Sequence, residues 1–236
     1  MRVAVCFSGL PKFFHHGHMF HAKYLFEKYN PDVFIHTWYN ESPFELDKLL
    51  SLYQPKGMFL QQDHKIVLPA TYTRGTSDRY PAYNIFSLNK SIMESNRLKE
   101  TYECEYNFKY DWVFRLRFDY ALSREFDLDN IDSSNLHFPL ELKERNMVTD
   151  QFAFSSSQNM DVYSTVFDHL DEYYNAGVKM VGEEMLTHHL LVNGLSDKIQ
   201  WHDMNHPFNP INGDSMANSL IRKEVSLIRD IHELLG

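Results

Sequence analysis

Short apolar runs alternate with segments of helical periodicity along the N-terminal part of the chain. Strands are predicted at 3–7, 32–38 and 56–60, because each run is apolar and is bounded by Gly or Pro. Helices are predicted between them, at 18–29 and 44–53. Strands that alternate with helices in this way are typical of a parallel sheet covered by helices.

The rest of the chain continues the alternation with shorter strands and longer helices. Helices are predicted at 83–102, 159–174, 182–193 and 215–235, strands at 112–118, 135–138 and 149–155, and a short apolar segment at 199–201. No internal repeat, low-complexity linker or clear domain boundary interrupts the pattern. We therefore expect a single-domain α/β fold over residues 1–236, with a Rossmann-like, mixed but mostly parallel sheet flanked by helices.

One polar segment, 61–81, is longer than the connections expected between such elements. Loops of this length in compact domains are often lids or binding loops. Arg74 and Arg79 lie in it and could reach phosphates, although a solvated position is the simpler interpretation for each.

The central strand at 112–118 carries charges in an apolar run. Arg115, Arg117 and Asp119 occupy alternate positions, so their side chains leave the same face. Charged side chains on so apolar a strand are costly unless they reach an open edge and a partner. We expect the carboxyl end of this strand to open onto a cleft with Asp119 at its rim, as in open α/β sheets that bind ligands. An Arg–Asp ion pair that closes the strand end is the alternative.

Composition narrows the choice of partners. The 236 residues are 43% hydrophobic, enough for a sizeable core, and the net charge is −9 with His neutral. Because no block of Lys or Arg stands out, a nucleic-acid partner is not expected. An anionic ligand would have to be held locally, by a metal ion or by a few placed Arg and Lys residues.

Cysteine usage and hydropathy indicate the compartment. Cys6 lies in an apolar strand and Cys104 at the end of a helical run, so both are predicted to be unpaired thiols of a reducing compartment. The apolar run 3–10 is too short for a signal peptide, and no run of about 18 apolar residues is present. We expect a soluble, cytoplasmic protein without a transmembrane segment.

A small-residue turn follows the first strand. Ser8 and Gly9 would allow backbone N–H groups to approach a nucleotide or phosphate. The turn has neither the dinucleotide fingerprint nor the P-loop pattern, so it is a weak signal by itself.

Four histidines come next: His15, His16, His18 and His21. Clustered histidines suggest a metal site, but no Cys or carboxylate stands at ligand spacing. A solvated loop is the favoured interpretation.

Several of these segments together resemble a known family. They are DVFIHTW at 32–38, RLRFD at 115–119, TDQFAFS at 149–155 and GEEML at 182–186. The chain resembles the small nucleotide-sugar glycosyltransferases of the A-type (GT-A) fold, found in bacterial polysaccharide clusters and large DNA viruses. The likeness runs from Val3 to about His206. It implies a nucleotide-binding part at about 1–120 and an acceptor-side part at about 121–236, in the host cytoplasm if the protein is viral.

The resemblance implies a metal cofactor, Mn²⁺ or Mg²⁺. Asp119 takes the place of the last Asp of the family's Asp-x-Asp motif, and a C-terminal His, His202 with His206 in reserve, would complete the metal site. Arg117 stands where the first Asp of the motif belongs, which is a departure. An Arg at that position could contact a phosphate or the donor sugar directly.

The resemblance also implies a donor site and a catalytic carboxylate. The donor would be bound by Phe7, Ser8, Gly9, Tyr83, Ser87, Arg117 and Asp119. Glu183 would face the acceptor as the base, with Glu184 and Asp150 as competitors. Stabilisation of a helix N-terminus is the simpler role for the two glutamates.

The function expected from the resemblance is metal-assisted transfer of a sugar from a nucleotide-diphosphate sugar to a glycan acceptor. Two alternatives stay open. A sugar nucleotidyltransferase would use a similar sheet, but it normally has a Gly-rich basic loop after the first strand, and this turn has one Gly. A non-catalytic glycan-binding module would suit the 15% aromatic content and the missing first Asp.

Overall fold

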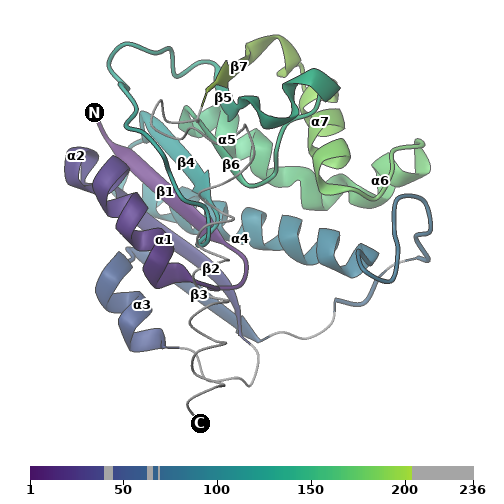
Figure 1. Cartoon of the computed structure of the whole chain (residues 1–236), viewed down its shortest axis with the longest axis horizontal. Coiled ribbons are helices and arrows are strands. Elements are labelled where there is room, and N and C mark those ends of the chain that lie inside the picture. The colour runs from purple at the N-terminus through teal and green to yellow at the C-terminus, as the bar shows by residue number, and fades with distance from the viewer. Residues whose placement is uncertain (40–44, 63–65, 69, 204–236) are drawn as a thin grey trace, which may run out of the picture.

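A seven-stranded sheet runs through the computed structural model, which describes residues 1–39, 45–62, 66–68 and 70–203. The strand order is β3-β2-β1-β4-β6-β5-β7 (Figure 1). The strands are β1 (Val3–Ser8), β2 (Asp32–Tyr39), β3 (Gly57–Gln62), β4 (Trp112–Leu116), β5 (Leu136–Pro139), β6 (Phe152–Ser155) and β7 (Ile199–His202). Only β6 runs against the others, pairing antiparallel with β4 and β5. The predicted mixed, mostly parallel α/β sheet is confirmed.

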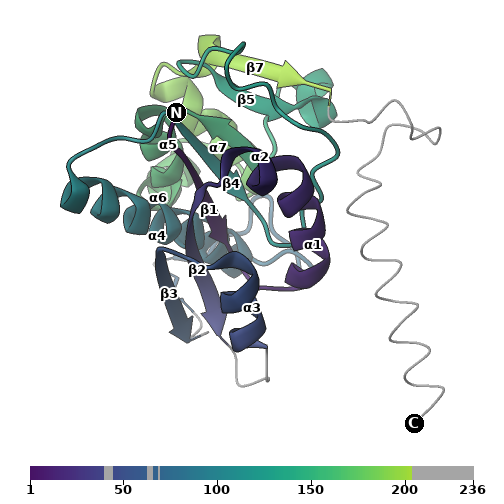
Figure 2. The ribbon, with the colours of Figure 1, turned by 90° about the vertical axis from the view of Figure 1, so that its left-hand side faces the viewer.

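Helices cover both faces of this sheet. The first face carries α1 (Phe14–His21), the π-helical turn η1 (Ala22–Phe26), α2 (Glu27–Tyr29) and α3 (Leu46–Tyr53). The second carries α4 (Ala82–Tyr106), α5 (Ser157–Tyr163), the 3₁₀ turn η3 (Ser164–His169), α6 (Leu170–Asn175) and α7 (Gly182–Val192). Figure 2 shows α1 and α3 on one side of β1 and β2, with α4 on the other. Two further 3₁₀ turns, η2 (Leu140–Arg145) and η4 (Ser196–Lys198), flank the β5–β7 edge.

Side chains of β1 point alternately to the two faces of the sheet, and each face packs into a core. Val3, Val5 and Phe7 pack into the core beneath α1 and α3, whereas Ala4 and Cys6 face the core beneath α4. Every residue of β1 is buried. A strand that is covered on both faces has apolar residues at successive positions. This pattern is why β1 could be predicted from the sequence.

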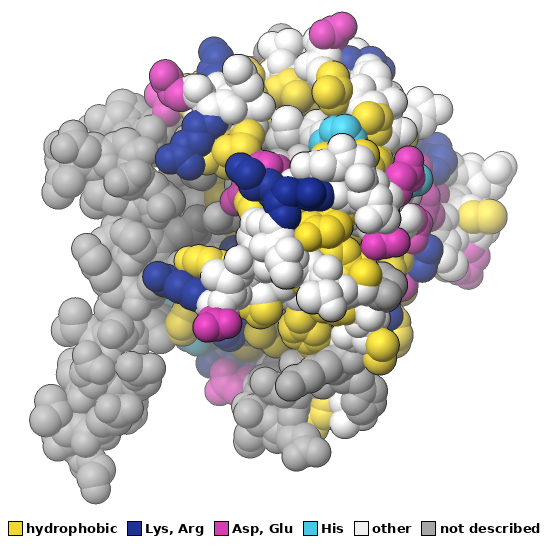
Figure 3. All heavy atoms as spheres, turned by 90° about the vertical axis from the view of Figure 1, so that its right-hand side faces the viewer, with side chains coloured by type: hydrophobic (Ala, Val, Ile, Leu, Met, Phe, Trp, Pro, Cys, Tyr) yellow, Lys and Arg dark blue, Asp and Glu magenta, His cyan; other side chains and the backbone are white. Residues whose placement is uncertain are grey.

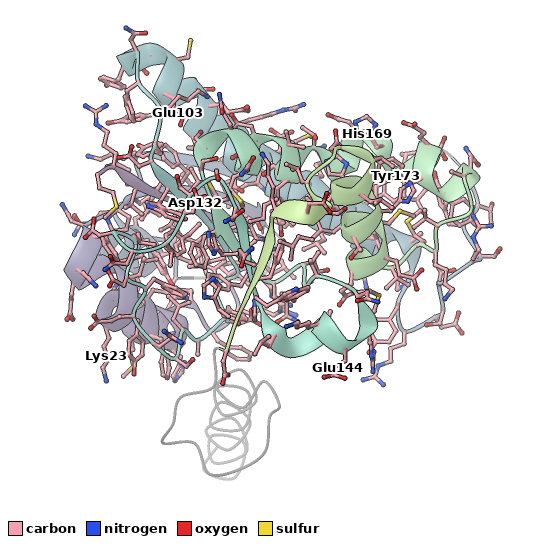
Figure 4. The ribbon with its side chains drawn as sticks, turned by 90° about the horizontal axis from the view of Figure 1, so that it is seen from above. Lys23, Glu103, Asp132, Glu144, His169 and Tyr173 are labelled. Atoms are coloured by element: carbon pink, nitrogen blue, oxygen red, sulfur yellow. The ribbon has the colours of Figure 1, made fainter. Side chains whose placement is uncertain are left out.

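The second face also contains a buried ionic network. Lys99 is fully buried in α4, and its Nζ lies 2.5 Å from Asp161 Oδ1 and 3.3 Å from Glu103 Oε2. Ser157 at the start of α5 donates to Glu103 at 2.6 Å. Figure 4 labels Glu103 towards the C-terminal end of α4. Because each buried charge has a partner, the network joins α4 to α5 without an unpaired ion.

Most predicted elements are present, with three main differences in the described residues. The helix expected at 159–174 is broken into α5, η3 and α6, and the turn η2 was not predicted. The histidines expected in a solvated loop lie instead on α1, and the side chain of His21 is fully buried. The helix predicted at 215–235 lies outside the described residues.

Two further predictions concern the thiols and the membrane. Cys6 and Cys104 are both free, as expected, and burial raises the pKa of the Cys6 thiol to about 12. Among the described helices, none combines the length and the apolar character needed to cross a membrane. On the face drawn in Figure 3, basic and acidic side chains are interspersed among hydrophobic ones, without a patch of one sign.

Candidate functional site

A pocket of about 360 Å³ opens at the carboxyl edge of the sheet. It is lined by Ser8, Gly9, Leu10, Lys12, Trp38, Tyr83, Asn84, Ser87, Leu88, Arg117 and Asp119. The strands β1, β2 and β4 are parallel, so their ends meet at one edge, and the first turns of α4 close the pocket from the side. This is where open α/β sheets bind their ligands. Six of the seven predicted donor-binding residues line it.

Phe7 is the exception among those seven. Its side chain is fully buried and stacks on Phe118 with ring centroids 5.2 Å apart. It also packs edge-on against Tyr53 at 4.8 Å. Phe7 points into the core on the face opposite α4, because neighbouring residues of a strand point to opposite faces.

Two hydroxyl groups on the pocket wall have no partner in the described part of the chain. Ser8 is only 2% exposed, and its Oγ makes no hydrogen bond there. The Oγ of Ser87, across the pocket on α4, is likewise buried and without a partner. Buried polar atoms are nearly always hydrogen-bonded, so two of them on one pocket suggest a polar ligand between them.

The turn after β1 is held rigidly by its neighbours. The N–H of Gly9 donates to Ser91 Oγ at 2.7 Å, and the carbonyl of Gly9 accepts from Thr37 Oγ1 at 2.9 Å. His36 Nδ1 lies 2.8 Å from Ser91 Oγ. The backbone of Gly9 has φ of 100°, a conformation that favours glycine. The expected contact between this N–H and a phosphate is therefore not available, since the N–H already has a partner.

Arg117 and Asp119 form a two-pronged ion pair in the pocket. Arg117 Nε lies 2.9 Å from Asp119 Oδ1, and Arg117 Nη2 lies 2.7 Å from Asp119 Oδ2. The Asp119 side chain is 10% exposed and that of Arg117 is 32% exposed. Lys12 adds a second cation to the lining. Asp119 thus lines a pocket at the end of the central strand, as one interpretation of the sequence expected. The Arg–Asp ion pair, which was the other interpretation, is present as well.

This arrangement does not fit a divalent cation at Asp119. Both carboxylate oxygens already accept from Arg117, whose positive charge would repel the ion by several kcal/mol at an effective dielectric constant of about 20. His202 lies on β7, which is separated from β4 in the sheet by β6 and β5.

His202 has a different partner from the one the resemblance implied. Its Nε2 lies 2.7 Å from His137 Nδ1, and its ring lies against Phe154. Burial and the nearby His137 lower the pKa of His202 to about 4. His206, its substitute, lies outside the described residues.

Two of the three candidate catalytic carboxylates meet beside this pocket. A Cβ placed on Gly182, the first residue of α7, would lie 2.3 Å from Asp150 Oδ2 and 3.6 Å from Cδ2 of Leu88, a pocket residue. Burial raises the pKa of Asp150, and the guanidinium groups of Arg115 and Arg117 act against that rise. Burial, followed by the charge of Asp150, raises the pKa of Glu183.

Glu184 differs from these two carboxylates. It forms an ion pair with Lys179, with Nζ 3.2 Å from Oε1, and its side chain is 29% exposed. A carboxylate that is paired and in contact with solvent has less reason to act as a base than one with a raised pKa beside the pocket.

Arg115, which the sequence placed on the central strand, lies buried close enough to Asp150 to affect its pKa. The side chain is 1% exposed, donates from Nη1 to the carbonyl of Gln151, and leaves Nε and Nη2 without a partner among the described residues. The hydroxyl of Tyr163 is buried and also makes no hydrogen bond to any described residue. Arg115 is the buried cation that most favours the charged form of Asp150. Its place among alternating charges on the central strand was the sequence signal for such a role.

A second hollow, of about 400 Å³, adjoins the first at Tyr83. It is lined by Leu68, Ala70, Thr71, Tyr72, Thr76, Ser77, Asp78, Pro81, Ala82 and Tyr83. Its hydroxyl-rich wall comes from the 66–81 loop, consistent with a binding loop. The two arginines of this loop have protein partners. Arg74 donates to the carbonyls of Tyr174 and Val178, and Arg79 lies over the ring of Tyr80.

Comparison with known proteins adds no family. No model of a known protein family matches this chain, and no curated protein is detectably similar to it in sequence.

Proposed function

We propose that this protein is a glycosyltransferase that uses a nucleotide-diphosphate sugar and a glycan acceptor. The observation that carries the proposal is the pocket at the β1–β4 edge. Its wall has two cations and two buried hydroxyls without a partner in the described part of the chain, and two carboxylates lie beside it. A nucleotide sugar supplies a matching set of groups, because its ribose and sugar hydroxyls need hydrogen-bond partners and its diphosphate needs positive charge. The resemblance to GT-A enzymes noted in the sequence is consistent with this assignment.

The residues divide into a donor part and an acceptor part. Ser8 and Ser87 would hydrogen-bond the nucleoside, and Trp38 and Tyr83 offer aromatic surfaces to the base or sugar. The second hollow beyond Tyr83 gives an acceptor glycan room next to the donor. Asp150, just before β6, and Glu183, at the start of α7, would then face the reacting hydroxyl.

The reaction breaks the bond between the anomeric carbon of the donor sugar and the diphosphate oxygen. An acceptor hydroxyl forms the new bond to that carbon, and Glu183 takes the hydroxyl proton as the bond forms. The nucleoside diphosphate leaves with the bonding electrons, so nearby positive charge stabilises it. Glu183 suits the role of base because its raised pKa brings it closer to the working pH than an ordinary carboxylate.

Incubation of the full chain with a panel of nucleotide sugars and candidate glycans tests the proposal. A glycosyltransferase releases the nucleoside diphosphate, fast with a suitable acceptor and slowly with water. Release of pyrophosphate from a nucleoside triphosphate and a sugar phosphate would instead identify a nucleotidyltransferase. Glycan binding with no nucleotide turnover would identify a binding module, and either result overturns the proposal.

A further inference from the structure

We propose that Lys12 and Arg117 form the diphosphate-binding subsite of the pocket and that they bind it without a metal ion, with Asp119 as the residue that positions Arg117. The inference rests on the proposed function, because it concerns the donor of that reaction. It differs from the metal site implied by the resemblance.

Two cations converge on the pocket from separate elements. Lys12 follows the β1 turn and Arg117 follows β4, and both line the pocket. Within the described chain Lys12 is in no ion pair, so its ammonium group is available to an anion. A lysine and an arginine together offer the charge and the several N–H donors that a diphosphate requires.

Asp119 fixes the direction of the guanidinium. It accepts from Nε and Nη2 and leaves Nη1 of Arg117 uncommitted by this pair. A guanidinium is planar, so holding one edge sets where the remaining N–H groups point. Asp119 neutralises part of the charge, and Lys12 then gives the pocket a net positive charge, as anion binding requires.

A neighbouring hydroxyl extends the same subsite. Ser8 Oγ lies next to the turn that leads to Lys12 and has no partner in the described chain. It can donate to a phosphate oxygen or a ribose oxygen within the same pocket. The pocket therefore contains charge and a directional donor for a diphosphate, without needing a cation between protein and ligand.

Calorimetric titration of the full chain with nucleoside diphosphates (ADP, GDP, CDP, UDP and dTDP), in EDTA and again in Mn²⁺, tests the inference. We expect at least one of them to bind in EDTA, with an affinity within about threefold of that in Mn²⁺. Lys12→Gln and Arg117→Gln should each weaken this binding by about tenfold or more. Lys143→Gln, at an exposed lysine of η2 outside the pocket, is the matched control and should stay within about twofold.

Asp119→Asn distinguishes the metal-free subsite from a metal site at Asp119. Without a metal, the Asn oxygen can still accept one hydrogen bond from Arg117, and the lost negative charge favours an anion, so we expect binding in EDTA to stay within about threefold of wild type. A metal site at Asp119 predicts the opposite: binding that needs Mn²⁺ and disappears in Asp119→Asn. That result overturns the inference and leaves the proposed function standing.

Two further outcomes keep the test decisive. Lys12 lies in an exposed loop, so Lys12→Gln tests the subsite even if Arg117→Gln does not fold. Equal loss of the diphosphate and of the bare nucleoside in Lys12→Gln would show a general defect and contradict a charge-specific role. Failure of every nucleoside diphosphate to bind, with or without Mn²⁺, removes the proposed function as well.

Discussion

Asp150 and Glu183 illustrate how one carboxylate tunes another. Each is partly withdrawn from water, which raises its pKa, and the negative charge of Asp150 raises the pKa of Glu183 further. Asp150 has two guanidinium groups, those of Arg115 and Arg117, to favour its charged form. Different environments for two neighbouring carboxylates commonly separate a base from a charge that assists it.

Asp150→Asn should move the pH dependence of transfer in a definite direction. A general base must be ionised, so kcat/KM rises with pH through the pKa of Glu183, which lies above the ordinary carboxyl value. Removing the Asp150 charge removes one cause of that raised pKa, and the acidic limb should move to lower pH. The measurement is kcat/KM against pH for the two proteins.

The control for this experiment is Glu144→Gln, at an exposed carboxylate of η2 that Figure 4 labels. This substitution should leave the acidic limb of the kcat/KM profile at the same pH as in the wild type. Glu183→Gln should lower the rate by about a hundredfold or more and remove the limb. An acidic limb that survives in Glu183→Gln would assign the base to another group.

At the scale of elements, the site depends on where β6 and α7 begin. Asp150 comes two residues before β6, and Gly182 is the first residue of α7. The two meet closely, because any Cβ at Gly182 would lie 2.3 Å from Asp150 Oδ2 and 3.3 Å from its Cγ. The glycine is thus needed for the carboxylate to sit against the start of the helix.

Gly182→Ala should therefore lower transfer without unfolding the protein. The new methyl group has to push the Asp150 side chain aside, whereas Ala is a better helix former than Gly by up to about 1 kcal/mol. We expect transfer to fall by about tenfold or more and the melting temperature to stay within a few degrees. Gly57→Ala on β3 is the control, since its closest contact is a ring atom of Phe34 at 3.2 Å, and it should retain transfer.

Sequence patterns predicted those elements whose burial is uniform. The strand at 32–38 and the long helix from 83 were readable because each has one periodicity along its length. The break of 159–174 into three pieces was not, because its apolar stripe continues across the 3₁₀ turn η3. The direction of β6 depends on its pairing with β4, which no local pattern encodes.

The same limit applies to the site. Ser8, Ser87 and Arg117 could be placed together because the ends of parallel strands and the following helix share one edge. Lys12 was missed, since a lysine after a proline in a loop gives no signal until the loop is placed. The partner of His202 was missed for a similar reason, because His137 comes 65 residues earlier in the chain.

The molecule as a whole contains buried histidines that couple its stability to pH. His21 is fully buried, with Nε2 2.7 Å from the carbonyl of Tyr120, and burial lowers its pKa to about 3. His36 is fully buried beneath the β1 turn, and burial lowers its pKa to about 4. Both are neutral in the fold at pH 5, whereas an unfolded histidine, with a pKa of about 6.5, is mostly protonated there.

The unfolded chain thus binds more protons than the fold between pH 6.5 and pH 4, so stability falls as pH falls through that range. From pH 7 to pH 5 the loss is about 2 kcal/mol for each histidine. Urea unfolding at the two pH values measures it. Carboxylates contribute to the same trend, so the informative quantity is the difference between wild type and a variant.

His36→Gln keeps polar partners for Ser91 and Gln61 but cannot be protonated. Whatever stability it loses at pH 7, its further loss between pH 7 and pH 5 should be smaller than that of wild type by about 2 kcal/mol. His21→Gln should show a similar reduction, because Gln can still donate to the carbonyl of Tyr120. If either variant kept the full wild-type loss, that histidine would have to be charged or accessible in the fold. For His36 this would mean that the turn carrying Ser8 and Gly9 is not held by a neutral imidazole, and the pocket would lose the rigid wall on which its donor site depends.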